Sequence, residues 1–307
     1  MAPMGMLPVA MGSGKSSSVQ LGKAAERFSV GTADLRAPDD PATLLNDSEF
    51  GVVRRLIAEY AGIKLSAQKR NMAYNRLLRR LRARGTGSFG AYLNLVQSEP
   101  AERQAFINAL TTNLTAFFRE PHHFELLATL AKARAGKRVA PMRIWSAGCS
   151  TGEEPWSLAM VLREAGCAGE IQATDVDTDV LATAASGLYR HDRVNGMDPQ
   201  RLRQHFLRGT GVNEGWVSVR PELRAMLRFG QFNLQTASWT AQNRFDAIFC
   251  RNVVIYFDKE FQKSLADRFA QMLVPGGVLV VGHSESFPAA HPEFRSCGRT
   301  AYRRISA

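Results

Sequence analysis

The sequence predicts an α/β protein in which an open, mostly parallel sheet follows an all-helical domain. From Met142 onward, short apolar runs alternate with longer amphipathic stretches, the pattern of a parallel sheet covered by helices on both faces. Before it, residues 46–118 carry apolar side chains at helical spacing. A third interval, residues 189–227, is dense in glycine around the short β run Trp216–Val219, which predicts a small antiparallel insertion.

Composition sets the broad class of the protein. The 307 residues are 45% hydrophobic, which is enough for about two domains. No apolar run approaches the roughly 20 residues that span a bilayer, so we expect no membrane insertion. The four cysteines form no CxxC pair, which indicates a reducing compartment and a cytoplasmic location. The net charge of +11 favours an acidic partner, and charge alone leaves open nucleic acid, an anionic membrane or a protein surface.

A resident metal ion is not expected. The six histidines show no HExxH pattern, and His122 and His123 are adjacent. Adjacent residues on a helix point about 100° apart, which makes these two a poor chelating pair.

Four regions follow one another along the chain. Residues 1–45 are rich in Gly, Ala, Ser and Pro and are predicted to be a flexible tail. A helical domain covers residues 46–118, a linker covers residues 119–141, and the sheet domain covers residues 142–307. The helical domain is expected to hold a first helix that Asp47 or Ser48 caps and Gly62 ends, then helices over Ala67–Arg84, over Phe89–Val96 and after Pro100.

The sheet domain shows four strand-like runs and three helices between them. A closing hairpin is expected at the end of the chain around Cys297-Gly298. The expected strands are Met142–Ala147, Glu170–Thr174, Phe245–Cys250 and Val278–Gly282, the helices lie near Pro155–Glu164, Asp177–Ala185 and Asp258–Leu273, and the hairpin covers Phe294–Ser306.

Polar residues at the carboxyl ends of the strands are the first candidates for a site, because ligands bind there in open parallel sheets. The first strand runs into Gly148–Pro155, which lacks the full GxGxxG motif and so disfavours NAD. Asp175 can accept hydrogen bonds from both hydroxyls of a ribose, whereas Asp177 is expected to cap the next helix. Arg251 and Asn252 follow a third strand. Each feature alone fits an ordinary turn or cap, but together they favour S-adenosylmethionine, a nucleoside cofactor without a pyrophosphate.

The segment Thr111–Glu120 lies where the helical domain meets the sheet domain. Its polar and apolar residues are suited to packing over a cofactor, and it ends in Arg119-Glu120. The alternative for Arg119 is a solvated or ion-paired arginine.

The second predicted helix is strongly basic and has no acid between Lys64 and Arg84. On a helical wheel, Lys69, Arg76 and Arg80 lie opposite the apolar face. Like charges at this spacing repel by a few tenths of a kcal/mol per pair. The stripe therefore favours a negatively charged partner, with a solvated outer face as the alternative.

Six segments carry a resemblance to the CheR family of chemotaxis receptor methyltransferases. The combination of NLTAFFRE, STGEEP and FCRNVxIYF in one chain is specific, and the resemblance spans about residue 46 to the C-terminus. The segments are KRNMAYNRLLRRLRAR (Lys69–Arg84), INALTTNLTAFFRE (Ile107–Glu120), WSAGCSTGEEP (Trp145–Pro155), Asp175–Leu181, Arg208–Val219 and FDAIFCRNVVIYFD (Phe245–Asp258).

The resemblance implies a Rossmann-like S-adenosylmethionine methyltransferase sheet with a small antiparallel β insertion. It implies methyl transfer to glutamate side chains of receptor cytoplasmic helices, giving methyl esters and S-adenosylhomocysteine. Arg119 and Tyr256 match residues beside the reacting methyl group, and the insertion resembles the β subdomain by which some members hold a pentapeptide at the receptor C-terminus. The positions that match cofactor contacts are Asn113, Thr115, Arg119, Glu154, Asp175, Asn233, Leu234, Arg251 and Asn252, and those assigned to receptor docking are Lys69, Arg76, Arg79 and Arg80.

Two other functions stay open on the sequence. A nucleic-acid methyltransferase would also be basic, but it would favour an NPP[YF]-type loop where this chain has Arg251-Asn252-Val253-Val254. A non-catalytic module that senses S-adenosylmethionine would not need Arg119 and Tyr256. We expect an enzyme that acts on receptor helices as a monomer, without a metal ion and without a nucleic-acid partner.

Overall fold

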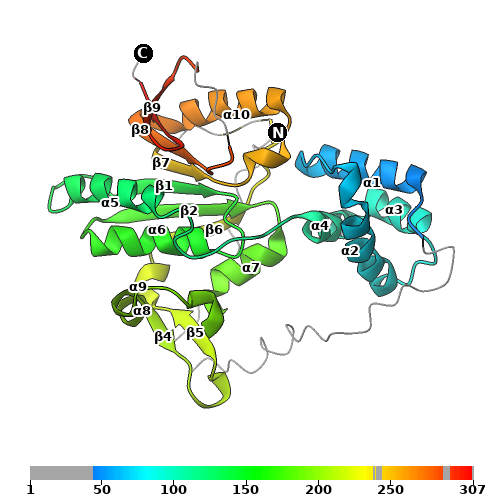
Figure 1. The fold of residues 1–307 in the computed structure, drawn as a ribbon, viewed down its shortest axis with the longest axis horizontal. Helices are drawn as coiled ribbons and strands as arrows, with labels where there is room; N and C mark the ends of the chain where they lie inside the picture. Colours follow the sequence, from blue (N-terminus) through cyan, green and yellow to red (C-terminus); the bar gives the residue numbers. More distant parts are fainter. Residues whose placement is uncertain (1–43, 238, 240–243, 286–290, 306–307) are drawn as a thin grey trace, which may run out of the picture.

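The computed structural model describes residues 44–237, 239, 244–285 and 291–305, so the predicted tail lies outside it except for residues 44 and 45. Two units lie side by side in this part of the chain (Figure 1). One is a bundle of helices, and the other is a sheet with helices on its faces. None of the described helices combines the length and the hydropathy that crossing a membrane requires.

The first unit is the predicted helical domain. Its first helix, α1 (Asp47–Ala61), begins after Asn46, which forms a capping box with Glu49, so the expected cap at Asp47 or Ser48 is corrected by one residue. Gly62, at a φ of 71°, ends α1 as predicted. The helices α2 (Arg70–Ala83), α3 (Phe89–Ser98) and α4 (Pro100–Leu110) share one core with α1, formed by Val53, Leu77, Tyr92, Phe106 and their neighbours.

The second unit is built on a seven-stranded sheet. Its strands are β1 (Met142–Ala147), β2 (Gly169–Asp175), β6 (Leu227–Gln231), β7 (Phe245–Cys250), β8 (Leu273–Val281), β9 (Phe294–Gly298) and β10 (Ala301–Arg304). They lie in the order β6-β2-β1-β7-β8-β10-β9, in which the first five run parallel. The last two form the predicted antiparallel hairpin. All four predicted strands are present, and the edge strand β6 has no counterpart among them.

Helices cover both faces of this sheet (Figure 1). The helices α6 (Glu153–Glu164) and α7 (Thr178–Ser186) pack on one face, and α10 (Lys259–Met272) packs on the other through Leu265 and Phe269. Asp177 caps α7 as predicted. The four cysteines are free, in agreement with their scattered spacing.

Residues 119–141, predicted to be a linker, contain a helix. This helix, α5 (His122–Arg134), packs against α6 and places Phe124, Leu127 and Ala131 in the core under the sheet. Pro121 precedes it without a capping hydrogen bond from a side chain. The usual polar marker of a helix start is therefore absent, and sequence reasoning missed the helix.

The predicted antiparallel insertion lies between α7 and β6. The strands β3 (Leu188–Arg190), β4 (Phe206–Arg208) and β5 (Trp216–Val219) form a sheet in the order β3-β5-β4. With α8 (Pro199–His205) and α9 (Pro221–Arg224) they form a projection at the bottom of Figure 1, which we call the β subdomain.

Candidate functional site

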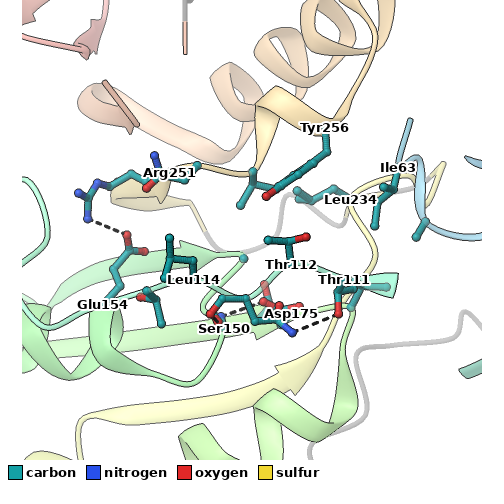
Figure 2. Close-up of a pocket in the computed structure, with 18 of the residues that line it drawn as sticks. Ile63, Thr111, Thr112, Leu114, Ser150, Glu154, Asp175, Leu234, Arg251 and Tyr256 are labelled. Atoms are coloured by element: carbon teal, nitrogen blue, oxygen red, sulfur yellow. Dashed lines mark hydrogen bonds and ion pairs between the residues drawn. The ribbon is translucent and has the colours of Figure 1, made fainter. Parts of the chain in front are cut away.

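A pocket opens at the carboxyl ends of β1, β2 and β7 (Figure 2). It encloses about 950 Å³ of empty space, its open mouth included. The structure brings together here all the cofactor and catalytic residues predicted from the sequence, while their roles stay predictions. These residues are Asn113, Thr115, Arg119, Glu154, Asp175, Asn233, Leu234, Arg251, Asn252 and Tyr256.

The helical domain supplies part of the pocket wall. Ala61 and Ile63 line the pocket at the end of α1, and the loop Thr111–Ala116 lines it after α4. The Lys64 backbone N–H donates to the Tyr256 carbonyl oxygen at 2.9 Å, which ties the end of α1 to the loop after β7. The pocket therefore depends on both units.

Asp175 lies at the end of β2, as predicted, and keeps acceptor capacity for a ligand. Its carboxylate accepts two hydrogen bonds, from the backbone N–H of Ser150 at 2.8 Å and of Asp177 at 3.0 Å. Burial raises the pKa of Asp175 to about 6, against the effect of these two hydrogen bonds. Asp177, in contrast, accepts four hydrogen bonds, two of them from Thr111 and Asn113, and is saturated.

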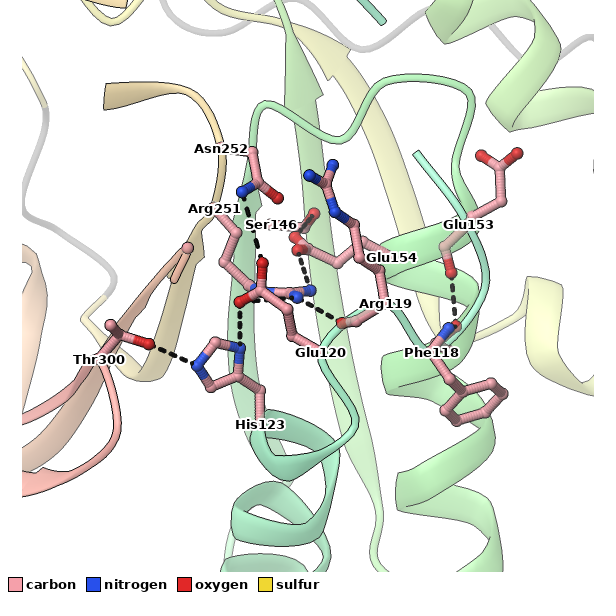
Figure 3. A network of polar contacts seen from close by, with 12 residues as sticks. Phe118, Arg119, Glu120, His123, Ser146, Glu153, Glu154, Arg251, Asn252 and Thr300 are labelled. Carbon is pink, nitrogen blue, oxygen red and sulfur yellow. Dashed lines mark hydrogen bonds and ion pairs between the residues drawn. The ribbon is translucent and has the colours of Figure 1, made fainter. Parts of the chain in front are cut away.

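Arg251 lies between two carboxylates at one end of the pocket (Figure 3). Its guanidinium is 3.1 Å from Glu154 and 3.5 Å from Glu120, and its side chain is only 2% exposed. Burial raises the pKa of Glu154, although Arg251 and the Ser146 hydroxyl oppose the shift. The Nε–H of Arg251 is buried and finds no acceptor among the described residues.

Arg119 is a second pocket arginine with a different environment. Its Nη1 donates to the Leu114 carbonyl oxygen at 2.9 Å, and no carboxylate in the described part of the chain pairs with it. Tyr256, in the 3-10 turn η7 (Val254–Tyr256), also lines the pocket, and its side chain points into it (Figure 2). A cation without a counter-ion and a phenol hydroxyl therefore border the same space.

The pocket fits a positively charged nucleoside of the size of S-adenosylmethionine. A Cβ on Gly148, whose φ is 88°, would lie 2.4 Å from Val253 Cγ2, so only glycine lets the first loop approach the loop after β7. Asp175 offers acceptors for a ribose diol. Glu154 and Arg251 offer opposite charges for the ammonium and carboxylate of the methionine part.

Ile63, Phe232 and Ser150 are among the pocket-lining residues that sequence reasoning did not single out. Ile63 and Phe232 add apolar surface, and both lie in irregular segments where periodicity carries no information. Ser150 has a φ of 49° and holds Asp175 through its backbone N–H. Ser150 could have been predicted from its position, because it lies in the loop at the carboxyl end of the first strand.

Beside the pocket, Glu120, His122 and His123 come together, with their potential ligand atoms within 4.8 Å of one another. The two histidine rings have centroids 4.1 Å apart, which is closer than adjacent positions on an ideal helix predict. Burial and then the charge of Arg251 lower the pKa of His123 to about 4. The same arginine is 3.5 Å from Glu120, and its fixed positive charge disfavours a metal cation at this carboxylate.

The basic face of α2 is partly neutralised within the chain. Arg80 forms an ion pair at 2.7 Å with Glu102, a buried carboxylate of α4, and Arg76 donates to a backbone carbonyl at the end of α4 at 2.5 Å. The expectation of an uncompensated charge stripe is therefore wrong for Arg80, while Arg76 is held by backbone carbonyls and keeps its charge. Lys69 and Arg79 are exposed, and no carboxylate of the described residues pairs with them.

Comparison with known families gives two matches that together cover most of the chain. Residues 48–111 match the CheR methyltransferase all-alpha domain, and residues 113–303 match the CheR methyltransferase SAM binding domain. The second match begins five residues before the end of our predicted helical domain. It therefore assigns the pocket loop with Asn113 and Thr115 to the same domain as the strand ends.

The chain is also similar to curated proteins over most of their length. It is 50% identical over 264 residues to the chemotaxis protein methyltransferase of Klebsiella aerogenes, covering 84% of this chain and 90% of that protein. It is 49% identical over 264 residues to the chemotaxis protein methyltransferase of Escherichia coli strain K12, and this match covers 84% of this chain and 91% of that protein. A third relative, chemotaxis protein methyltransferase 2 of Pseudomonas aeruginosa, is 48% identical over 258 residues, covering 83% and 92%. The chain therefore belongs to the CheR family of S-adenosylmethionine-dependent chemotaxis protein methyltransferases.

Proposed function

We propose that this protein transfers the methyl group of S-adenosylmethionine to glutamate side chains of chemotaxis receptor cytoplasmic helices. The products are γ-glutamyl methyl esters and S-adenosylhomocysteine. The observation that carries the proposal is that Arg119, a cation without a carboxylate partner among the described residues, lines the same pocket as Tyr256. An acidic side chain of a partner completes this arrangement. The protein acts as a monomer in the cytoplasm, where these receptor helices lie.

The pocket residues hold the cofactor by complementary chemistry in this proposal. Asp175 accepts the ribose hydroxyls, while Glu154 and Arg251 meet the charged ends of the methionine part. When bound, S-adenosylmethionine supplies a methyl group attached to positively charged sulfur. The remaining cofactor contacts are assigned to Asn113, Thr115, Asn233, Leu234 and Asn252.

The reaction needs alignment more than acid–base chemistry. A glutamate carboxylate is already ionised near pH 7, so no general base is required. A bond forms between a carboxylate oxygen and the methyl carbon, the bond from that carbon to sulfur breaks, and its electron pair stays on sulfur. Opposite charges disappear together, so exclusion of water favours the step. Arg119 holds the carboxylate and the Tyr256 hydroxyl orients it, an alignment that can contribute ~7–11 kcal/mol.

Labelled cofactor tests this function directly. The protein is incubated with cytoplasmic fragments of chemotaxis receptors or with RNA, and the label is followed. We expect base-labile methyl groups on receptor glutamates, and replacement of the labelled glutamates by alanine should abolish them. Label on RNA would support a nucleic-acid methyltransferase instead, and cofactor binding without transfer to either would support a sensing module.

We also propose that the exposed part of α2 docks the acidic receptor helices. Lys69, directly before α2, and Arg79 and Arg82 within it are exposed cations, whereas Arg76 and Arg80 are held by α4 and the loop after it. Reversal of Arg80 would break its pair with Glu102 and confound the test.

Reversing two of these exposed charges, Lys69→Glu with Arg79→Glu, is expected to raise the receptor KM about tenfold and to leave the cofactor Kd unchanged. The wild-type rate should also fall with salt, because screening reaches about 10 Å at 0.1 M. Steady-state assays on receptor fragments measure both effects. The matched control is Lys137→Glu with Arg138→Glu, an exposed pair at the far end of the sheet domain. An equal rise in KM for both double variants would assign the effect to net charge rather than to α2.

The β subdomain offers a second attachment site. Its outer strands β3 and β4 each pair on one side only, with β5. Leu207 in β4 is 43% exposed, and Val212 in the following turn is 98% exposed. We propose that a receptor C-terminal pentapeptide pairs along this sheet, because an extended peptide can complete the hydrogen bonds of an edge strand.

Replacement of Asp175 by alanine is expected to weaken cofactor binding by about 1.5–3 kcal/mol, the range for hydrogen bonds to a charged group. Because burial raises the pKa of Asp175 to about 6, the carboxylate is protonated as the pH falls below that value and loses acceptor capacity. Wild-type affinity should therefore decrease from pH 7 to pH 5, and the variant should lack this step. Calorimetry checks both, with Asp179→Ala on the exposed face of α7 as the control. An unchanged affinity in folded Asp175→Ala contradicts the assignment.

A further inference from the structure

Glu285 is a buried carboxylate that the mechanism above does not use. It follows β8, is 6% exposed, and is not among the residues that line the pocket. Its carboxylate accepts four backbone N–H groups, from Gly282 at 2.6 Å, Asn252 at 2.8 Å, Val254 at 2.6 Å and Ile255 at 3.3 Å. Three of these donors belong to the loop after β7.

The loop after β7 needs support from outside itself. Asn252 has a φ of 60°, in the left-handed region that residues other than glycine adopt only occasionally. The following turn η7 is short, and the first N–H groups of a helical turn have no acceptor within it. Oε1 of Glu285 takes up the N–H groups of Val254 and Ile255 and so replaces a capping residue.

The other carboxylate oxygen joins this loop to the end of β8. Oε2 of Glu285 accepts from both Asn252 and Gly282. The two segments approach so closely that a Cβ on Gly282 would lie 2.4 Å from Asn252 Nδ2 and 2.9 Å from the Asn252 backbone nitrogen. One side chain therefore fixes both ends of the loop, next to Tyr256.

We propose that Glu285 is a positioning residue for methyl transfer, holding the Asn252–Tyr256 loop so that the Tyr256 hydroxyl stays directed at the reacting groups. This inference rests on the proposed function of the pocket. Glu285 acts through the loop and touches neither cofactor nor substrate. Both oxygens must be acceptors, because each receives two N–H groups, and a glutamine would turn an NH₂ donor toward N–H donors.

A double-mutant cycle between Glu285→Gln and Tyr256→Phe tests the proposal. Single-turnover rates are measured at saturating cofactor and receptor fragment. Each single change is expected to lower the rate about tenfold with little change in receptor KM. Because Tyr256→Phe removes the hydroxyl that Glu285→Gln misdirects, the double variant should be no slower than the slower single variant.

Purely structural damage gives a different result. Losses that multiply in the double variant, or a wild-type rate for Glu285→Gln, overturn the proposal. Glu260→Gln, at an exposed position in the first turn of α10, is the matched control and should keep the wild-type rate. If Glu285→Gln does not fold, Glu285→Asp retains the charge and enters the same cycle. A wild-type protein that methylates no glutamate would instead overturn the proposed function, before any variant is compared.

Discussion

Replacement of Arg119 by alanine is expected to lower kcat about a hundredfold at saturating cofactor and receptor fragment, the scale found when one oriented donor is removed from a reacting anion. The structure separates the two pocket arginines. Arg251 is neutralised by Glu120 and Glu154 and also donates to the Arg119 carbonyl oxygen, whereas the Arg119 guanidinium donates only to the Leu114 carbonyl oxygen within the described residues. Removal of Arg119 therefore leaves the substrate carboxylate without a cationic partner. Quenched single-turnover assays measure the loss.

Two further variants show whether the geometry of Arg119 matters. Arg119→Lys keeps the charge but loses the planar fork, so it should recover only part of the rate. Arg228→Ala removes an exposed arginine that also donates to backbone carbonyls, but on β6 away from the pocket, and should be neutral. A wild-type single-turnover rate for Arg119→Ala would refute its assignment to the chemical step.

Replacement of Arg251 by alanine is expected to destabilise the protein without cofactor by about 3–5 kcal/mol at pH 8, because it leaves a carboxylate buried and unpaired. Glu154 loses its one ion-pair partner among the described residues, whereas Glu120 keeps its contacts with His123 and His283, so Glu154 carries most of the expected loss. Urea unfolding of the wild type and the variant gives the difference in their free energies of unfolding, provided that both proteins show the same m value. The matched control is Arg134→Ala, whose pair with Asp246 at 2.7 Å is partly exposed, and its loss should be no more than about 1 kcal/mol.

The sign of the pH dependence gives a second check on Arg251. Burial already raises the pKa of Glu154 above its usual value, and loss of the arginine raises it further. A carboxyl group whose pKa is higher in the folded than in the unfolded state favours the folded state as the pH falls. The loss in free energy of unfolding caused by Arg251→Ala, relative to the wild type, should therefore become smaller between pH 8 and pH 5. A deficit that is small at pH 8, or that grows toward pH 5, contradicts the paired arrangement.

Local sequence rules predicted the elements whose ends carry their own markers. Gly62 ends α1 through its left-handed backbone, and Asp177 caps α7 through its side chain. The helix α5 has no such cap, and the edge strand β6 is short and partly exposed, so both escaped prediction. A single sequence therefore predicts best those helices and strands whose ends carry a capping side chain or a glycine.

Contacts between distant segments explain what else the sequence could not show. The strand-end rule placed Asp175, Arg251 and Asn252 at one edge of the sheet, and the structure agrees. The acid that neutralises Arg80 is Glu102, 22 positions away on another helix, and no helical wheel of α2 contains it. Glu285 is equally invisible, because its four partners are backbone N–H groups whose convergence depends on the tertiary fold.

The wall that the helical domain contributes to the pocket links two binding events. The end of α1 and the loop after α4 complete the cofactor pocket, while α2 of the same bundle presents the cations proposed for docking. If α2 docks the receptor as proposed, a cofactor that contacts both units would also set the orientation in which the receptor meets α2. Such coupling is reciprocal, since two ligands that favour the same arrangement change each other's dissociation constants by the same factor. Pocket occupancy and receptor engagement are then two readings of a single equilibrium between the domains.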